Sequence, residues 1–535
     1  MIQIDPRATA VKSTTCPFCS YGCEFGIVSD DLGIRGVEYL SGTAPNFGRL
    51  CPRGSAAAYY MNHPRRMTSP VKDNLSVSWD KIVKDLKRYM KKPEQVAVTF
   101  DRNLTREEYF RIMNFCGQNG IGVSASSYLE PESLLSPLIR EEKPFTWADL
   151  DAANSVIIVG DLFQQAPMTS KHIIEWRYRD RKNRLVVIDS LGTYTGKFAT
   201  DFLKVGIGYE TLTVLALCGA LDPSVDSGSI PAARIREIGD HLKTAPAGLI
   251  FAVLPFGRHY DPILFIQALK TLGETTGKKV VPFVEFAEYM GTKRFGDVLE
   301  MVRAKKIKQI INFGEIFPFV YPQVARQMKG AEIYASAVLK PPGTNSGQSV
   351  NNWTKMTMLP AALNLEKTGT VLTSLGLRAI KTEIPVASGA QNVNQILARF
   401  GTVDSPDQFT RPADFSVAVA ERIGILMRKI QNPKKDRYLL VGEKTAYNFM
   451  AFWEAEHVRI NPADARRIAL KHGESVLIRS KNGEAEFAAE ISDSVPAGVL
   501  AVPVETGRTK FLFEFEIDQG FVNFPPVEVE LWRKE

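Results

Sequence analysis

Cysteine placement is the feature of this chain of 535 residues that most constrains its fold. Four of the six cysteines lie within the first 51 residues. They are Cys16, Cys19, Cys23 and Cys51, with the spacing C-x2-C-x3-C-x27-C. The first three thiols are too close together to belong to separate structural disulfides, and thiolates clustered in this way are typical ligands of a soft metal centre. The pattern therefore predicts a loop that is folded around metal.

Two kinds of metal centre fit four cysteines. Structural zinc sites usually pair two C-x2-C units, whereas here three cysteines share one loop and the fourth comes from a distance. A [4Fe-4S] cluster matches this arrangement, because one loop can reach three iron corners and a distant residue can reach the fourth. We predict such a cluster, with zinc or unliganded thiols as alternatives. The other two cysteines, Cys116 and Cys218, have apolar neighbours at helical spacing, so we expect buried structural thiols there.

Composition and charge exclude several classes of protein. Hydrophobic residues make up 44% and charged residues 23%, which is ordinary for a globular protein. The sequence has no apolar run long enough for a membrane helix and no visible secretory signal, so we expect a cytoplasmic location, where disulfides are rare. The net charge of +7 is spread along the chain, so binding of nucleic acid is not expected.

Buried strands alternate with helices through the middle of the chain. Near-continuous apolar runs of this kind predict parallel sheets that are covered on both faces. Beyond a linker at 431–437 the pattern becomes mostly β, with one helix that we expect to begin at Asn461 and end at Gly473, and a hairpin turn at Asn482–Gly483. The expected strands of the α/β region lie at 95–100, 154–161, 184–190, 248–257, 278–287 and 308–316.

Several motifs together resemble a known family. The four cysteines followed by Pro52–Arg53–Gly54, the segments SVIIVGDLFQQAPM, RLVVIDSLGT and LPAALNLEKTGTVLTSLG, and the C-terminal stretch from VRINPADARRIALKHG onward are similar to molybdopterin oxidoreductases with an N-terminal [4Fe-4S] domain. That family includes formate dehydrogenase catalytic subunits and the large iron–sulfur subunit of respiratory complex I. The resemblance implies an α/β, multi-domain scaffold with parallel sheets, a cluster domain at 1–68, α/β domains at 69–432 and a C-terminal dinucleotide-binding-like β-barrel at 433–535.

The same resemblance implies a molybdopterin guanine dinucleotide carrying Mo or W, but the metal-ligand position differs. In our alignment Leu129 stands where the family places a Cys, selenocysteine, Ser or Asp ligand, and Glu130 stands where formate dehydrogenases carry a His. Ser126, Ser127 or Glu130 would be the ligand if the register is shifted by a few residues. We therefore assign no catalytic residue.

The phosphate-binding segments differ as well. The family's Asp-Pro-Arg after the second nucleotide strand is Asp189–Ser190–Leu191 here, and its Gly-Thr-Asp element is Gly208–Tyr209–Glu210. The Gly-Thr-rich loop that opens the C-terminal domain is replaced by 442–445, Gly-Glu-Lys-Thr. Bulky Phe163 and Gln164 follow Gly160–Asp161, where small residues would let backbone N–H groups approach a phosphate. These differences count against binding of the dinucleotide.

These observations favour an iron–sulfur electron-transfer subunit of an oxidoreductase complex. Arg53 occupies the position that in the family often carries a basic side chain between cluster and pterin, although a surface arginine at a helix start is the alternative. The partners implied are subunits that carry flavin or further iron–sulfur clusters, in the cytoplasm or at the periphery of a membrane complex. An active Mo- or W-pterin oxidoreductase resembling formate dehydrogenase is the alternative function.

Overall fold

The chain forms two compact units in the computed structural model. Unit 1 comprises 1–133, 285–413 and 519–521, and unit 2 comprises 134–284, 414–518 and 522–535. The domain boundaries expected from the sequence stay a prediction. The structure describes residues 10–31, 33–73, 75–126, 130–139, 142–224, 230–285, 291–314, 322–340, 355–381, 387, 389–401, 418–430, 433–434, 436–445, 457–504, 509 and 511–534.

A small antiparallel sheet opens unit 1. Its strands are β1 (Ala10–Thr15), β2 (Glu24–Asp30) and β3 (Gly33–Glu38), in that order across the sheet. Two short helices follow, α1 (Pro52–Ser55) and α2 (Ala57–Met61), and α2 packs against β3. Strands β2 and β3 are joined by a tight turn, since Asp30 pairs with Gly33.

A larger sheet of seven strands forms the rest of the unit 1 core. It comprises β5 (Leu75–Ser76), β4 (Val71–Lys72), β15 (Lys355–Pro360), β14 (Glu332–Ala337), β13 (Gln309–Phe313), β6 (Val96–Phe100) and β7 (Gly122–Ala125), in that spatial order. The last five strands of this order pair in parallel. Helix α4 (Arg106–Gln118) connects β6 to β7, and a capping box between Thr105 and Glu108 fixes where it begins.

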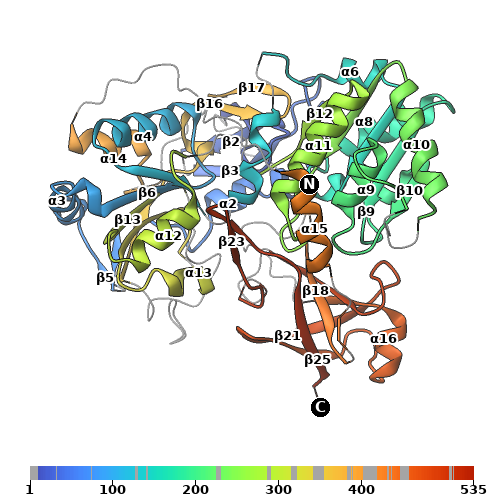
Figure 1. The fold of residues 1–535 in the computed structure, drawn as a ribbon. Helices are drawn as coiled ribbons and strands as arrows, with labels where there is room; N and C mark the ends of the chain where they lie inside the picture. The colour runs from blue at the N-terminus through green and yellow to red at the C-terminus, as the bar shows by residue number, and fades with distance from the viewer. Residues whose placement is uncertain are drawn as a thin grey trace. The chain divides into compact units, whose positions relative to one another are not determined.

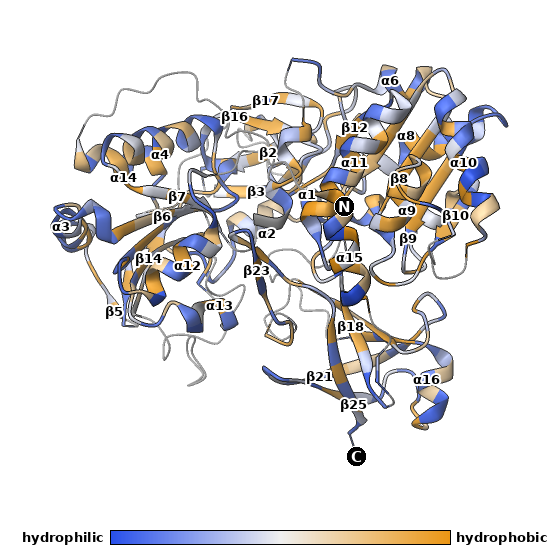
Figure 2. Cartoon of the chain, in the orientation of Figure 1, coloured by the Kyte–Doolittle hydropathy of each residue, from blue (hydrophilic) through white to orange (hydrophobic). Residues whose placement is uncertain are grey.

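Unit 2 contains a parallel sheet of five strands. These are β10 (Asp201–Lys204), β9 (Arg184–Asp189), β8 (Ser155–Val159), β11 (Gly248–Ala252) and β12 (Lys279–Pro282), in that order. Helices α8 (Thr169–Arg179), α9 (Glu210–Leu217), α10 (Ala232–Thr244) and α11 (Pro262–Thr276) lie beside it (Figure 1). Figure 2 shows these strands in hydrophobic colours and the outer side of α10 in hydrophilic ones, as expected for a covered sheet.

Unit 2 also contains a closed barrel of six strands. The order is β18 (Tyr438–Glu443), β22 (Val499–Pro503), β19 (His457–Ile460), β21 (Gly483–Ile491), β20 (Ser475–Ser480) and β25 (Val527–Arg533). The expected hairpin turn is confirmed, because Ser480 pairs with Gly483. The fold class predicted from the sequence, parallel sheets with a C-terminal β-barrel, is therefore confirmed.

The predicted helix in the barrel segment begins as expected but ends early. Asn461 caps α16 (Pro462–Arg467) by accepting a hydrogen bond from the Ala463 N–H at 2.8 Å. The expectation that this helix continues to Gly473 is wrong. Ala469 adopts a left-handed conformation (φ 51°), which stops the helix and lets Leu470 enter the core.

Glycines permit close backbone contact between the five-stranded sheet and the barrel. Gly192 N–H donates to the Ser494 carbonyl at 2.6 Å, and Gly442 N–H donates to the Gly257 carbonyl at 3.3 Å. A Cβ at position 442 would collide with the carbonyl oxygen of Phe256. The sheet loops and the barrel therefore form one continuous surface within unit 2.

Substitution at Gly442 tests this contact. We expect Gly442→Ala to lower the free energy of unfolding by about 1–3 kcal/mol, because backbone atoms must move to admit the methyl group. Gly117→Ala is the matched control, since a methyl group added there would meet no atom within 4 Å. That control should be neutral or stabilising by up to about 1 kcal/mol, as is usual for glycine in a helix. Thermal unfolding followed by circular dichroism compares the two, and equal stabilities would contradict the expectation.

Candidate metal centre and ligand pocket

The first three cysteines lie on a loop that the small sheet closes at its base. Cys16 directly follows β1 and Cys23 directly precedes β2, and the Cys16 N–H donates to the Cys23 carbonyl at 2.7 Å. Gly22, with φ 66°, turns the chain before Cys23, and its N–H donates to the Cys19 carbonyl at 3.3 Å. The antiparallel pairing of two strands thus fixes where the loop begins and ends.

A buried asparagine connects this loop to the segment that carries the fourth cysteine. Asn46 accepts a hydrogen bond from the Glu24 N–H at 2.7 Å and donates to the carbonyls of Glu24 at 2.9 Å and Arg49 at 2.7 Å. Cys51 follows as the N-cap residue of α1. Asn46 therefore holds the approach to Cys51 beside the start of β2, a role that the sequence pattern did not reveal.

The four thiols act on one another electrostatically. Burial raises the pKa of the Cys16 thiol well above its ordinary value, and the Cys51 and Cys19 thiols raise it further. Burial also raises the pKa of Cys23, where the other three cysteines add to the effect. Cys16, Cys23 and Cys51 are buried, and Cys19 is partly exposed. All six cysteines are free thiols, and the expectation of buried thiols at Cys116 and Cys218 is confirmed.

Arg53 places a positive charge in the same region. Its side chain is only 1% exposed, so the alternative of a surface arginine is wrong. The guanidinium lowers the pKa of both Cys16 and Cys23, although burial outweighs it. A buried cation beside buried thiols favours the thiolate form that metal binding requires.

The donor set fits an iron–sulfur cluster. The four thiols lie near enough to affect the pKa of Cys16 and Cys23, and the cost of ionising buried thiols is offset when cationic iron binds. In the part of the chain that the structure describes, no group of three or more His, Cys, Asp or Glu side chains is placed so that it could hold a metal ion, so the cluster assignment depends on the cysteine spacing and the Fe4S4 domain. A cubane takes one thiolate at each of four iron atoms.

The expected metal-ligand loop follows β7. The Ser126 N–H donates to the Phe100 carbonyl at 2.8 Å, and Ser126 is buried. Ser127, Leu129 and the side chain of Glu130 lie outside the described residues. The assignment of Leu129 to the ligand position stays a prediction.

A pocket of about 400 Å³ lies in unit 2, where the five-stranded sheet meets the barrel. Residues after the carboxyl ends of β8, β9 and β11 form one wall, which is the edge where parallel α/β sheets bind ligands. Residues of β19 and of the segments after β18 and β21 form the other wall. The charged and ionisable lining includes the basic residues Lys197, Arg258, Lys444, His457 and Arg459 and the acidic residues Asp161, Glu443, Glu490 and Asp493.

Arg258 supplies a cation that the sequence motif lacks. Its guanidinium pairs with the Asp189 carboxylate and donates to the Ser190 hydroxyl at 2.7 Å. A carboxylate oxygen of Glu210 lies 3.7 Å from the same guanidinium. The Glu210 carboxylate also accepts a hydrogen bond from the Gly208 N–H at 2.9 Å. The arginine missing after Asp189 in the sequence is thus matched by one from the loop after β11. Only the three-dimensional structure brings it there.

The other sequence differences reach the pocket unequally: Gln164, Glu443, Lys444 and Thr445 line it, whereas Phe163 is not among its lining residues. Phe163 is buried and its ring packs against Tyr194 and Phe198. Arg459 pairs with Glu443, with Nε 3.0 Å from one carboxylate oxygen, and donates to the Ser494 hydroxyl at 2.6 Å. The pocket lining thus combines four cations with four carboxylates, and two of its arginines, Arg258 and Arg459, are paired with carboxylates.

Two family models match the ends of the chain. Residues 9–63 match the "Molybdopterin oxidoreductase Fe4S4 domain", and residues 433–520 match the "Molydopterin dinucleotide binding domain". The chain carries two domains of the molybdopterin oxidoreductases. The Fe4S4 domain contains all four clustered cysteines, and the dinucleotide-binding domain supplies one wall of the pocket. The two domains support the two cofactors implied by the resemblance.

Relatives and a solved structure agree with these domains. The chain is 22% identical over 234 residues to F420-dependent formate dehydrogenase subunit alpha of Methanocaldococcus jannaschii, covering 39% of this chain and 33% of the relative. It is 25% identical over 299 residues to NADPH-Fe(3+) oxidoreductase subunit alpha of Geobacter sulfurreducens, covering 53% and 35%. The chain thus spans about a third of the length of these relatives. Acetylene hydratase from Pelobacter acetylenicus shares the fold, with a TM-score of 0.71, 13% identity and coverage of 98% of this chain and 100% of that chain.

Asp161 in the pocket gives a prediction for pH dependence. Burial raises its pKa from the ordinary 3.8 to about 6. A hydrogen bond from the Thr195 hydroxyl at 2.5 Å lowers the pKa, but burial outweighs it. Because the folded state then binds the proton more tightly than the unfolded state, wild-type stability falls as pH rises from about 4 to about 6. Asp161→Asn removes the cost of ionising this buried carboxyl group. The free energy of unfolding of the variant, relative to that of the wild type, should therefore increase between pH 4 and pH 6, by at most about 3 kcal/mol. Melting temperatures measured from pH 4 to pH 8 check this, and a difference that does not change with pH would contradict it.

Proposed function

We propose that this chain is an iron–sulfur electron-transfer subunit of an oxidoreductase complex. Cys16, Cys19, Cys23 and Cys51 bind the [4Fe-4S] cluster. The scaffold is that of a molybdopterin oxidoreductase in which Leu129 occupies the position of the Mo or W ligand. The observation that carries the proposal is the three-cysteine loop closed by the hydrogen bond between Cys16 and Cys23, with the Cys51 thiol and the buried Arg53 near enough to act on both. When bound, the cluster exchanges single electrons at a potential that burial, charge and hydrogen bonds to sulfur determine.

The protein contributes charge and solvent exclusion to this centre. Burial of three cysteines keeps water from most of the site, while Cys19 remains partly exposed. The fixed charge of Arg53 stabilises the reduced form of the cluster, which is more negative than the oxidised form. Arg53 therefore raises the reduction potential and favours acceptance of an electron.

The partners we propose are subunits that carry flavin or further iron–sulfur clusters. Relatives named as alpha subunits of an NADPH-Fe(3+) oxidoreductase and of formate dehydrogenases support assembly with other subunits. None of the helices in the described part of the chain has the length and apolar character needed to span a bilayer. We place the complex in the cytoplasm, or at the periphery of a membrane complex, which suits six free thiols.

A second function is supported by the pocket in unit 2. Its cations Lys197 and Lys444 suit the phosphates of a pterin dinucleotide, and the dinucleotide-binding domain supplies one wall. An active Mo- or W-pterin oxidoreductase resembling formate dehydrogenase is therefore the alternative. That function would also need a metal ligand near 126–130.

Metal analysis of anaerobically purified protein separates the two functions. Electron transfer alone predicts about four iron atoms per chain without Mo or W. Mo or W in stoichiometric amount would overturn that proposal in favour of the alternative, and zinc in place of iron would overturn both. Cys51→Ser should abolish the low-temperature EPR signal of the reduced cluster, whereas Cys116→Ser, at a buried cysteine outside the group, should leave it unchanged.

Charge removal at Arg53 tests how the potential is set. Arg53→Gln should lower the midpoint potential by on the order of 50 mV, because loss of the buried unit charge at Arg53 removes on the order of 1 kcal/mol of stabilisation from the reduced cluster. Arg53→Lys should restore most of the potential, since it keeps the charge. Arg49→Gln removes an exposed charge two residues before Cys51 and should have a much smaller effect. Potentiometric titration followed by EPR measures all three, and equal potentials for Arg53→Gln and Arg49→Gln would refute the role of Arg53.

A further inference from the structure

A hairpin far along the chain lies against the cysteine loop. Strands β16 (Thr368–Thr373) and β17 (Gly376–Lys381) form this hairpin, which belongs to unit 1 like the cysteines. At its turn the Ser374 N–H donates to the Ser20 carbonyl at 2.7 Å, and the hydroxyls of Ser374 and Ser20 are also 2.7 Å apart. Both serines are buried, and Ser20 directly follows Cys19.

The hairpin touches the neighbours of the remaining cysteines as well. The Thr15 hydroxyl, next to Cys16, donates to the Ala379 carbonyl at 2.7 Å. The Thr373 methyl group packs over Gly22, where an added Cβ would lie only 2.7 Å from it. Arg378 donates to the Ala44 carbonyl at 2.6 Å, in the segment that leads to Cys51. One hairpin therefore contacts the loop that carries Cys16, Cys19 and Cys23 and the segment that precedes Cys51.

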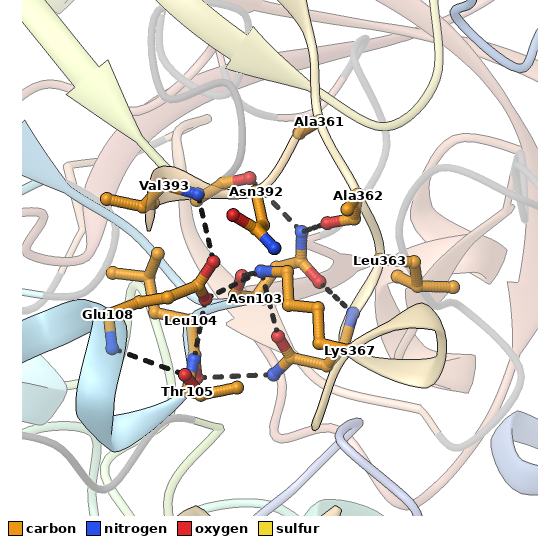
Figure 3. Close-up of polar contacts among 12 residues, drawn as sticks. Asn103, Leu104, Thr105, Glu108, Ala361, Ala362, Leu363, Lys367, Asn392 and Val393 are labelled. Carbon is orange, nitrogen blue, oxygen red and sulfur yellow. Dashed lines mark hydrogen bonds and ion pairs between the residues drawn. The ribbon is translucent and has the colours of Figure 1, made fainter. Parts of the chain in front are cut away.

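A buried polar network fixes the base of the hairpin (Figure 3). The Lys367 ammonium donates to the Asn103 carbonyl at 2.6 Å, the Glu108 carboxylate at 2.8 Å and the Asn364 side chain at 3.2 Å. Its three protons thus have three acceptors. Glu108 also accepts hydrogen bonds from the backbone N–H groups of Thr105 at 2.9 Å and Val393 at 3.0 Å.

A second contact anchors β16 to the start of α4. The Thr370 N–H and hydroxyl donate to the two oxygens of the Glu107 carboxylate, at 2.9 and 2.8 Å. A buried, fully hydrogen-bonded charge pair gives little net stability but strongly disfavours other arrangements, because separating the pair would leave a charge buried alone. The network around Lys367 thus determines where the turn at Ser374 lies.

We propose that this hairpin is part of the cluster site and that Ser374 is a positioning residue for it. Ser374 holds Ser20, and through it the backbone between Cys19 and Cys23, while Lys367 and Thr370 hold the hairpin. The hydroxyls of Ser20 and Ser374 form one hydrogen bond with each other. Ser374 thus adds a buried O–H group beside the one that Ser20 already supplies in the cysteine loop. Hydrogen bonds and polarity near the sulfurs raise a cluster's potential. The inference rests on the proposed cluster.

Ser374→Ala in the full-length, cluster-loaded protein tests the proposal. It removes the hydroxyl pair and leaves the backbone hydrogen bond to Ser20 in place. We expect a lower midpoint potential, an altered EPR line shape, and several-fold faster loss of the visible absorbance of the cluster in the presence of an iron chelator. Thr370→Val, which loosens the base of the hairpin, should hasten cluster loss with a smaller change in potential.

Two variants serve as matched controls. Leu377→Ala changes an exposed side chain on the same hairpin, and Ser76→Ala breaks a pair of hydroxyls, Ser76 and Ser69, 3.0 Å apart elsewhere in unit 1. Both should match wild-type protein in potential and in rate of cluster loss. If Ser374→Ala matches them, the inference is overturned while the cluster assignment stands. Wild-type protein that binds no iron would overturn the cluster assignment and the inference together.

Discussion

The N-terminal part of the molecule depends on one electrostatic constraint, the cost of holding four thiolates close together out of water. Burial and mutual repulsion both disfavour the ionised thiols, as the raised pKa values of Cys16 and Cys23 show. The cationic iron of a bound cluster offsets this cost, and the positive charge of Arg53 further favours the thiolate form of Cys16 and Cys23. The surrounding contacts then fix the positions of the cysteines. Strand pairing holds Cys16 beside Cys23, and the side chain of Asn46 holds the segment before Cys51.

The pocket in unit 2 shows how a lost motif can be matched from another part of the chain. A sequence motif reveals a cationic residue only when that residue is close in sequence to the strand at the binding site. Arg258 lies in a different loop, yet it reaches Asp189 and Ser190 because parallel strands bring their carboxyl ends to one edge. The absence of an Asp-Pro-Arg triplet is therefore only a weak argument against anion binding.

Features with local causes were predictable from the sequence, and features with distant causes were not. Cysteine spacing, the apolar strands and the Asn461 cap depend on residues within a few positions of one another, and so does the turn at Gly483. The early end of α16 was missed because Ala469 adopts its unusual conformation to bury Leu470 in tertiary packing. The contact between Ser20 and Ser374 spans 354 residues, and nothing near either serine indicates the other. The family resemblance covered 359–376, which includes the first strand of the hairpin, but predicted neither the hairpin nor its contacts.

The two cofactor sites bear on function through different chemistry. The pocket would hold the dinucleotide part of a pterin cofactor through cations, and this binding does not depend on whether a metal is coordinated near Leu129. A bound dinucleotide would therefore be compatible with electron transfer alone, with the organic part serving structure. Catalysis at Mo or W additionally needs a metal ligand near 126–130, and a site for the substrate beside it. The choice between the two functions thus depends on metal content and not on occupancy of the pocket.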